Sequence, residues 1–149
     1  LCEFRGVKRR MEVIYEDKGI KLYDDFAHHP TAISSTLEGL RNQVGKETIL
    51  AIIEPRSHTM KNGTHESTLD QSTASADEAL WYEPDNLDWD FRSALGSSIN
   101  KVSNDIQDII HHAVEFTANQ KPAHIVIMSN GGFSGIHKKL TSALKKAAD

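Results

Sequence analysis

The chain has little cysteine and no long hydrophobic run. Cys2 is the single cysteine among 149 residues, so no disulfide can form within the chain, and a reducing cytoplasm suits this composition. The longest apolar run spans Ile49 to Ile53 and is far shorter than the roughly 20 residues of a membrane-spanning helix. The formal net charge of −4 gives no basic footprint for nucleic acid or for an anionic membrane. We therefore expect a soluble globular domain that binds neither.

The chain also lacks a starting methionine and an apolar stretch of the secretory type near its first residue. We therefore expect a cytoplasmic protein and a piece of a longer chain. A length of 149 residues with 38% hydrophobic residues is enough for one domain with its own core. Residues 1–149 are accordingly predicted to be a single domain.

Strand patterns alternate with helix patterns along this domain. Predicted strands cover 11–16, 20–25, 48–54, 79–82 and 123–128, and a hairpin turn, Asp17-Lys18-Gly19, joins the first two. Predicted helices cover 31–44, 67–76 (a weak pattern), a segment capped by Ser103 or Asn104, and 135–147, while residues 83–100 are loop-rich. The alternation predicts the α/β class: a Rossmann-like, largely parallel sheet with helices on both faces and an antiparallel N-terminal hairpin.

Ligands of such sheets bind at the carboxyl ends of the strands, and the segment that follows the second strand is rich in reactive side chains. Asp24 and Asp25 are adjacent in a strand and point to opposite faces, so only one of them can enter a given site. His28 and His29 precede a helix whose first turn contains a proline. Adjacent histidines rarely converge on one metal ion, whereas a histidine at a helix N-terminus can donate to an oxyanion. Phe26 is predicted to fill the core.

Two further stretches follow predicted strands. Arg56, Thr59 and Lys61 lie in a polar segment that offers two cations and two hydroxyls, and an exposed loop without function is the alternative for Lys61. Asn130, Gly131 and Gly132 follow a buried strand, and glycines there let the backbone approach a ligand. The Arg9-Arg10 pair, taken alone, favours a solvated start of the first strand.

One near-match to a phosphate-binding loop is rejected. The stretch from Gly39 to Thr48 has one residue too many between its glycines, and Glu47 replaces the required hydroxyl. It also runs from helix to strand, the reverse of the required order. No P-loop is therefore predicted in this chain.

Four stretches together resemble the carboxyl-terminal domain of the Mur ligases, ATP-dependent enzymes that form amide bonds in bacterial cell-wall precursors. These are Gly6 to Glu12, Asp24 to Ile33, Glu54 to Lys61 and Met128 to His137. The form with Phe26 and Thr31-Ala32-Ile33 is most similar to the branch whose acceptor is a peptide. The family more often has asparagine where His58 stands, so no role is assigned to His58.

The resemblance implies a function for a complete enzyme that uses ATP and Mg²⁺. It would join L-Ala-γ-D-Glu-meso-diaminopimelate to UDP-N-acetylmuramate through an acyl phosphate, in peptidoglycan recycling. The N-terminal UDP-binding domain and the central ATPase domain, with most Mg²⁺ ligands, would be missing here, so this chain alone would be inactive and would hold no metal. The implied roles are nucleotide binding by Arg10 and Asp25, phosphate contact by His28 and His29, and peptide binding by Arg56, Thr59, Lys61, Asn130, Gly131 and Gly132.

Two alternatives remain open. The chain could be the same domain of a UDP-N-acetylmuramate–L-alanine ligase, which has a similar His-His-Pro-Thr motif. It could also be a non-catalytic α/β module that acts by binding a partner.

Overall fold

The computed structural model describes residues 11–27, 29–54, 70–83, 95, 99–129 and 133–148. The strands are β1 (Glu12–Asp17), β2 (Ile20–Asp25), β3 (Thr48–Ile53), β4 (Glu78–Tyr82), β5 (Asn100–Ser103) and β6 (Ala123–Met128). The helices are α1 (Pro30–Val44), α5 (Ile106–Ala118), the 3-10 turn η2 (Phe133–Gly135) and α6 (Ile136–Ala148). None of the helices in this part of the chain has the length and hydrophobicity needed to cross a membrane.

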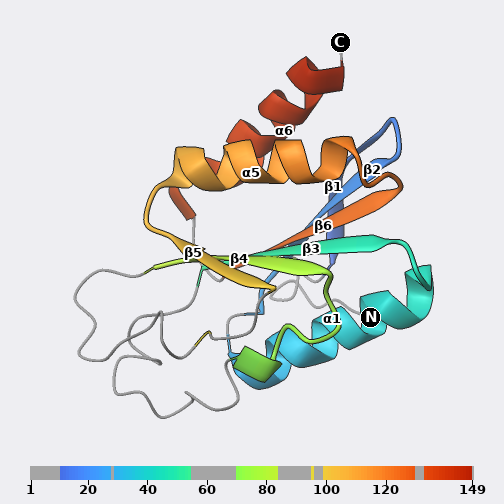
Figure 1. Cartoon of the computed structure of the whole chain (residues 1–149), viewed down its shortest axis with the longest axis vertical. Helices are drawn as coiled ribbons and strands as arrows, with labels where there is room; N and C mark the ends of the chain where they lie inside the picture. The colour runs from blue at the N-terminus through green and yellow to red at the C-terminus, as the bar shows by residue number, and fades with distance from the viewer. Residues whose placement is uncertain are drawn as a thin grey trace, which may run out of the picture.

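The strands form one six-stranded sheet in the order β1-β2-β6-β3-β4-β5 (Figure 1). β1 pairs with β2 in the antiparallel sense, and every other neighbouring pair is parallel. The predicted fold class is therefore confirmed, including the N-terminal hairpin. Lys18 and Gly19 form its turn with φ values of 50° and 83°, and both values suit a hairpin turn with two left-handed residues.

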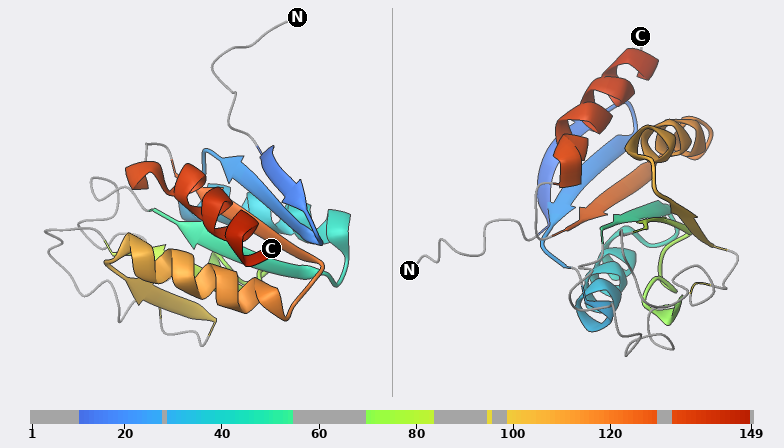
Figure 2. Two further views of the ribbon diagram at one scale, coloured as in Figure 1. Left: turned by 90° about the horizontal axis from the view of Figure 1, so that it is seen from above. Right: turned by 90° about the vertical axis from the view of Figure 1, so that its left-hand side faces the viewer.

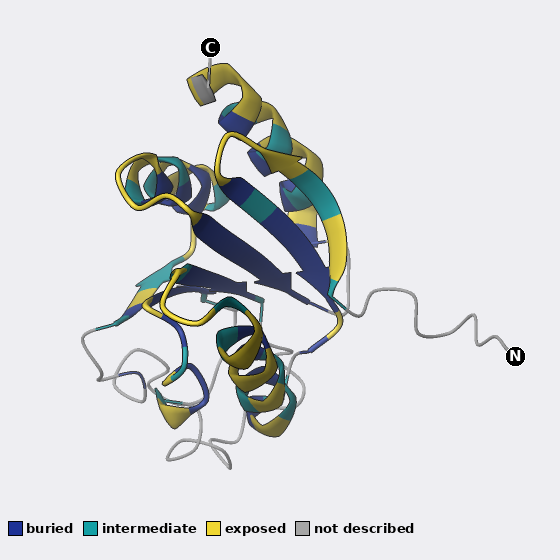
Figure 3. Cartoon of the chain, turned by 90° about the vertical axis from the view of Figure 1, so that its right-hand side faces the viewer, coloured by how far each residue is buried: buried dark blue, intermediate teal, exposed yellow. Residues whose placement is uncertain are grey.

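Helices cover both faces of the sheet (Figure 2). On one face, α1 packs through Ile33, Leu37 and Leu40 against alternate residues of the strands. On the other face, α5 and α6 pack side by side against the remaining strand residues. The central strands β3 and β6 are buried on both sides, as Figure 3 shows, which explains why they are almost continuously apolar.

Helix α1 begins and ends where its sequence directs. Pro30 occupies the first helical position, where its missing N–H removes no helix hydrogen bond. Gly45 ends the helix with a φ of 68°, and its N–H donates to the Arg41 carbonyl oxygen over 3.0 Å. The direction in which the chain leaves β2 and enters β3 is thus fixed locally.

Several predictions about local structure are wrong. The strand β5 was not predicted, because its four residues are too few to show a period and Val102 is its one apolar residue. Helix α5 is capped by Asp105, whose side chain accepts from the Gln107 N–H over 2.9 Å, and not by Ser103 or Asn104. Of the weak helix predicted over 67–76, only Asp70 and Gln71 are helical among residues 70–76.

The prediction that Phe26 fills the core is also wrong. Its side chain is 46% exposed and does not fill the core, because the chain has already left β2 at Asp25. The core position on this side is taken by Ala27, which is buried against the α1 face.

Candidate functional site

The candidate site lies where β2, β6 and β3 end beside one another. β2 continues into α1 on one face of the sheet, whereas β6 continues into η2 and α6 on the other face. Such a reversal between neighbouring strands opens a crevice at their carboxyl ends, the usual ligand site of open α/β sheets. Two hydrogen bonds continue the sheet beyond the strands here: the Ser129 N–H donates to the Asp25 carbonyl oxygen over 3.1 Å, and the Glu54 N–H to the Met128 carbonyl oxygen over 2.9 Å.

Asp25 ends β2 with its carboxylate turned to the α1 face. The side chain is 3% exposed and accepts three hydrogen bonds. Oδ1 accepts from the Met11 N–H over 2.8 Å, and Oδ2 accepts from the Ala27 N–H over 3.0 Å and from the Thr36 hydroxyl over 3.2 Å. One carboxylate therefore connects the start of β1, the end of β2 and the second turn of α1.

The first turn of α1 lies at the same edge. His29 is its N-cap residue, in an extended conformation, and its side chain makes no capping hydrogen bond. No acidic residue lies in the first turn, so the positive end of the helix is not neutralised from within. The start of α1 therefore favours an anion.

The α6 face of the same edge holds a second set of polar side chains. Asp24 is 8% exposed, and its Oδ1 accepts from the Nε2 of His137 over 2.9 Å. The Ser129 hydroxyl donates to Oε1 of Glu54 over 2.5 Å, which is short, as expected for a bond to a carboxylate. Asp24 and Asp25 thus point to opposite faces, as their adjacency in a strand predicts.

The described carboxylates of this edge do not gather into a metal site. Among the described residues there is no group of three or more His, Cys, Asp or Glu side chains that could hold an ion. Asp24 is paired with His137, and Asp25 is surrounded by donors, whereas Mg²⁺ needs oxygen ligands around it. The described part of the edge therefore does not fit Mg²⁺.

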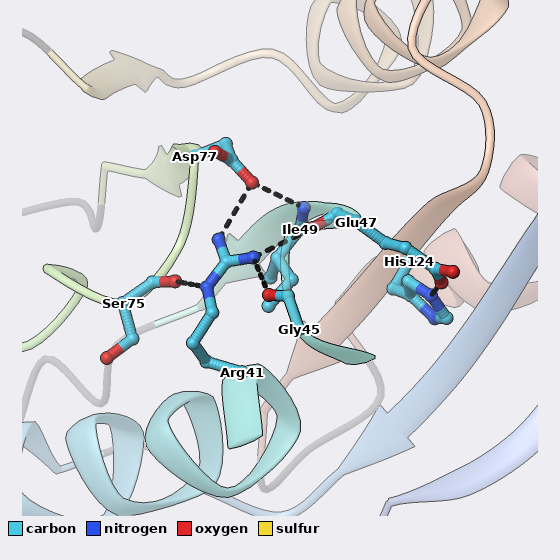
Figure 4. Close-up of polar contacts among 7 residues, drawn as sticks. All are labelled: Arg41, Gly45, Glu47, Ile49, Ser75, Asp77 and His124. Atoms are coloured by element: carbon cyan, nitrogen blue, oxygen red, sulfur yellow. Dashed lines mark hydrogen bonds and ion pairs between the residues drawn. The ribbon is translucent and has the colours of Figure 1, made fainter. Parts of the chain in front are cut away.

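A different polar network lies at the amino-terminal end of β3, opposite the strand ends that form the candidate site (Figure 4). Arg41 donates to the carbonyl oxygens of Ser75, Gly45 and Glu47 and to Oδ2 of Asp77, over 2.8–3.0 Å. The same Asp77 oxygen accepts from the Ile49 N–H over 2.8 Å. This network joins the end of α1 to the start of β3, and its polar groups hydrogen-bond to one another.

Three hydrogen-bonded side chains lie beside it, of which Tyr23 and His124 are buried and Glu47 is exposed. The Tyr23 hydroxyl bonds Nδ1 of His124 over 2.9 Å, and Nε2 of His124 bonds Oε1 of Glu47 over 2.7 Å. Burial raises the pKa of the Tyr23 hydroxyl above its ordinary value, and the carboxylates of Glu16 and Glu47 raise it further. These hydrogen bonds join β2 to the amino-terminal ends of β6 and β3, away from the candidate site.

Comparison with known proteins decides the family. A family model described as "Mur ligase, glutamate ligase domain" matches residues 9–131. The chain belongs to the Mur ligase family. This Mur ligase domain is 41% identical over its whole length to the UDP-N-acetylmuramate–L-alanyl-γ-D-glutamyl-meso-2,6-diaminoheptandioate ligase of Escherichia coli, of which it covers 33%. The chain thus spans about a third of the length of that relative.

Solved structures agree with this assignment. A murein peptide ligase from Psychrobacter arcticus 273-4 superposes with a TM-score of 0.81 and 46% identity, over 95% of this chain and 31% of that one. A domain of a putative UDP-N-acetylmuramate:tripeptide ligase from Haemophilus ducreyi superposes with a TM-score of 0.74 and 38% identity, over 91% of this chain and 99% of that one. Because the latter was crystallised as a domain, we expect the Mur ligase domain described here to fold on its own.

Relatives of the alternative kind match less of the chain. A UDP-N-acetylmuramate–L-alanine ligase from Caldicellulosiruptor bescii is 49% identical over 57 residues, which are 38% of this chain and 12% of that protein. Another, from Desulfitobacterium hafniense (strain Y51), is 36% identical over 103 residues, which are 69% of this chain and 21% of that protein. The likeness to relatives of this kind therefore covers less of the chain than the likeness to the peptide ligases.

The structure describes two of the predicted site residues of the Mur ligase domain, Asp25 and His29, and both lie at the carboxyl edge. The others lie outside the described residues: Arg10, His28, Arg56, Thr59, Lys61, Asn130, Gly131 and Gly132. Their described neighbours in sequence, Met11, Glu54 and Ser129, all bond within this edge. The assigned roles therefore stay predictions.

Sequence reasoning missed three contributors to this edge. Thr36 follows two serines on α1, and His137 closes the stretch Met128 to His137 that resembles the family. No local pattern distinguishes either side chain from a solvated helix position. Ser129 lies within a stretch that resembles the family, next to Asn130, but a serine after a buried strand has no specific meaning by itself. Its contact with Glu54 joins residues 75 positions apart and becomes visible only in the folded sheet.

Proposed function

We propose that residues 1–149 are the carboxyl-terminal domain of an ATP-dependent ligase that joins L-Ala-γ-D-Glu-meso-diaminopimelate to UDP-N-acetylmuramate. The reaction forms an amide bond and serves peptidoglycan recycling in the bacterial cytoplasm. The amino-terminal UDP-binding domain and the central ATPase domain would precede this chain in the complete protein. Without them the isolated domain would not turn over substrates.

One observation carries this proposal. The carboxyl edge brings Asp25 and the uncapped start of α1 beside the ends of β6 and β3, which lead into the two predicted peptide-binding stretches. The names of the relatives that match nearly the whole chain supply the substrate class. A nucleotide site and an acceptor site at one edge are what a ligase domain requires.

The residues take the following roles. Arg10 and Asp25 bind the nucleotide, with Asp25 directed at the ribose and oriented by its bonds to Ala27 and Thr36. His28 and His29 contact phosphate at the positive end of α1, where a developing anion is stabilised.

The acceptor peptide binds on the other side of the crevice. Arg56 holds a carboxylate of the peptide with its planar fork of donors, with Thr59 and Lys61 in support. Asn130, Gly131 and Gly132 form the second wall. The chemistry then depends on positioning. The carboxylate of UDP-N-acetylmuramate attacks the terminal phosphoryl group of ATP, which forms an acyl phosphate and releases ADP. The peptide amine then attacks the carbonyl carbon, and phosphate leaves as the nitrogen loses a proton.

Two other functions compete with this one. An L-alanine ligase would use the same nucleotide site with a smaller acceptor, but relatives of that kind match 38–69% of this chain, whereas the tripeptide ligases match 97–100% of it. A binding module would need no ATP at all, and a helix start without acidic residues in its first turn, beside the buried Asp25, favours the ligase.

The decisive experiment is an acceptor assay with the intact ligase, the full-length protein that carries residues 1–149 as its carboxyl-terminal domain. ADP release is measured with UDP-N-acetylmuramate and either the tripeptide or L-alanine, alongside the isolated domain. Turnover with the tripeptide and none by the isolated domain supports the proposal. Turnover with alanine alone assigns the chain to the alanine ligases, and no turnover with either leaves the binding module.

A further inference from the structure

The pair formed by Asp24 and His137 lies at the candidate site, although the proposed mechanism does not use it. Nε2 of His137 and Oδ1 of Asp24 are 2.9 Å apart, and the two side chains are 19% and 12% exposed. His137 is the second residue of α6, and Asp24 is the penultimate residue of β2. The pair therefore fixes the start of α6 to the strand that carries Asp25.

The turn that precedes His137 has an unfavourable backbone. Phe133 and Ser134 have φ values of 48° and 53°, and Gly135 follows with 73°. Residues other than glycine avoid this left-handed region, so such a turn persists only where the surrounding structure holds it. It comes directly after the predicted peptide wall, which ends at Gly132.

Two contacts hold this turn. Phe133 is 2% exposed and its ring packs edge-on against the ring of Tyr82, with centroids 5.8 Å apart. The hydrogen bond between His137 and Asp24 holds the other end, two residues after the turn. Phe133 is thus fixed by packing and His137 by a directional bond, which leaves the turn little freedom.

The two faces of β2 separate this pair from the nucleotide residues. Asp25 faces α1 through its bonds to Ala27 and Thr36, whereas Asp24 faces α6. A change at His137 should therefore disturb the acceptor side of the crevice and leave the nucleotide side in place.

We propose that His137 is a positioning residue for the acceptor peptide, which it serves by holding the turn Phe133–Gly135 against Asp24. This inference rests on the proposed ligase function and adds a residue that determines how the acceptor binds. It requires no contact between His137 and the substrate.

The test uses the intact ligase and separates positioning from stability. His137→Leu removes the donor, His137→Gln keeps an N–H near the same place, and His111→Leu is the matched control, because His111 is 73% exposed on α5. The double variant Asp24→Leu/His137→Leu replaces both partners with apolar groups and should recover stability lost by the single variant.

We expect His137→Leu to lower kcat/KM for the tripeptide by about 10- to 100-fold, since small misplacements near a reacting group have effects of this size. The KM for ATP should stay within about twofold, His137→Gln should recover most of the loss, and His111→Leu should behave as the unchanged protein. The double variant should regain its melting temperature without regaining kcat/KM for the tripeptide.

Three results would overturn the proposal: an unchanged kcat/KM for the tripeptide in His137→Leu, a rise in the KM for ATP as large as the loss of kcat/KM for the tripeptide, or recovery of kcat/KM for the tripeptide together with stability in the double variant. An intact protein without ligase turnover would instead refute the proposed function, so the two failures are distinguishable.

Discussion

Replacement of Asp25 tests whether this residue is structural, functional or both. Asp25→Ala leaves three donors without their acceptor: the N–H groups of Met11 and Ala27 and the hydroxyl of Thr36. An unsatisfied buried donor costs about 1–3 kcal/mol. The bonds to Met11 and Thr36 are only partly buried, so water replaces part of the loss. We therefore expect a decrease in the free energy of unfolding of about 3–5 kcal/mol.

Asp25→Asn has a smaller expected effect. One amide oxygen still accepts, but the NH₂ group cannot, so one or two of the bonds are lost at a cost of about 1–3 kcal/mol. Glu38→Ala is the control for lost charge, because Glu38 is exposed on α1, and its effect should stay within about 0.5 kcal/mol.

Urea unfolding of the 149-residue domain, followed by circular dichroism, measures these differences. With a denaturant slope of about 2 kcal/mol/M, Asp25→Ala should shift the midpoint by roughly 2 M. A shift no larger than that of Glu38→Ala would refute the reasoning from the three hydrogen bonds. In the intact ligase, Asp25→Asn should remain folded and lose affinity for ATP, and unchanged ATP affinity would leave Asp25 with a structural role alone.

Three further predictions concern the scaffold. Asn100→Leu should destabilise the domain by about 2–4 kcal/mol, because the indole N–H of Trp81 donates to Oδ1 of Asn100 over 2.9 Å and would lose this acceptor in the core. Urea unfolding measures the change, and a loss of stability below about 1 kcal/mol would contradict the prediction. Tyr23→Phe should reduce the loss of stability that occurs above pH 10. Because the pKa of Tyr23 is higher in the folded than in the unfolded state, its contribution to stability is complete below the ordinary pKa of 10.0 and disappears as the pH rises through the raised pKa. Parallel curves of stability against pH for the two proteins would refute this. Arg41→Met should lower the melting temperature by an amount equivalent to about 1–2 kcal/mol. The control is Lys46→Met, because Lys46 is exposed. Equal melting temperatures of the two variants would show that the network in Figure 4 contributes nothing to stability.

Much of the fold could be predicted because its signals are local. The continuous apolar runs of β3 and β6 indicated strands buried on both faces, and Gly19 indicated the hairpin turn. Pro30 and Gly45 marked the ends of α1. Each of these signals depends on backbone sterics or on periodicity within a few residues, so the sequence displays it without knowledge of the rest of the chain.

β5 escaped prediction because its stability comes from distant residues. Asn100 accepts from Thr73 and Trp81 and donates to Asp70, so one buried amide holds the preceding turn and β4 against an edge strand. An asparagine after a loop-rich stretch gives no such signal in the sequence. Phe26 escaped for the opposite reason: an aromatic residue beside a strand usually packs inward, but here the strand ends one residue earlier.

The candidate site shows the same division. The sequence by itself determined that Asp24 and Asp25 face opposite ways and that a helix begins after His29, because strand alternation and proline placement are local. Only the tertiary structure decided which partners each carboxylate has. Asp25 accepts from Thr36 in the second turn of α1, and Asp24 bonds to His137, which is 113 positions away in the sequence. The physical reason is that a hydrogen bond depends on the distance between two groups in the folded chain, and strand order sets that distance independently of sequence separation.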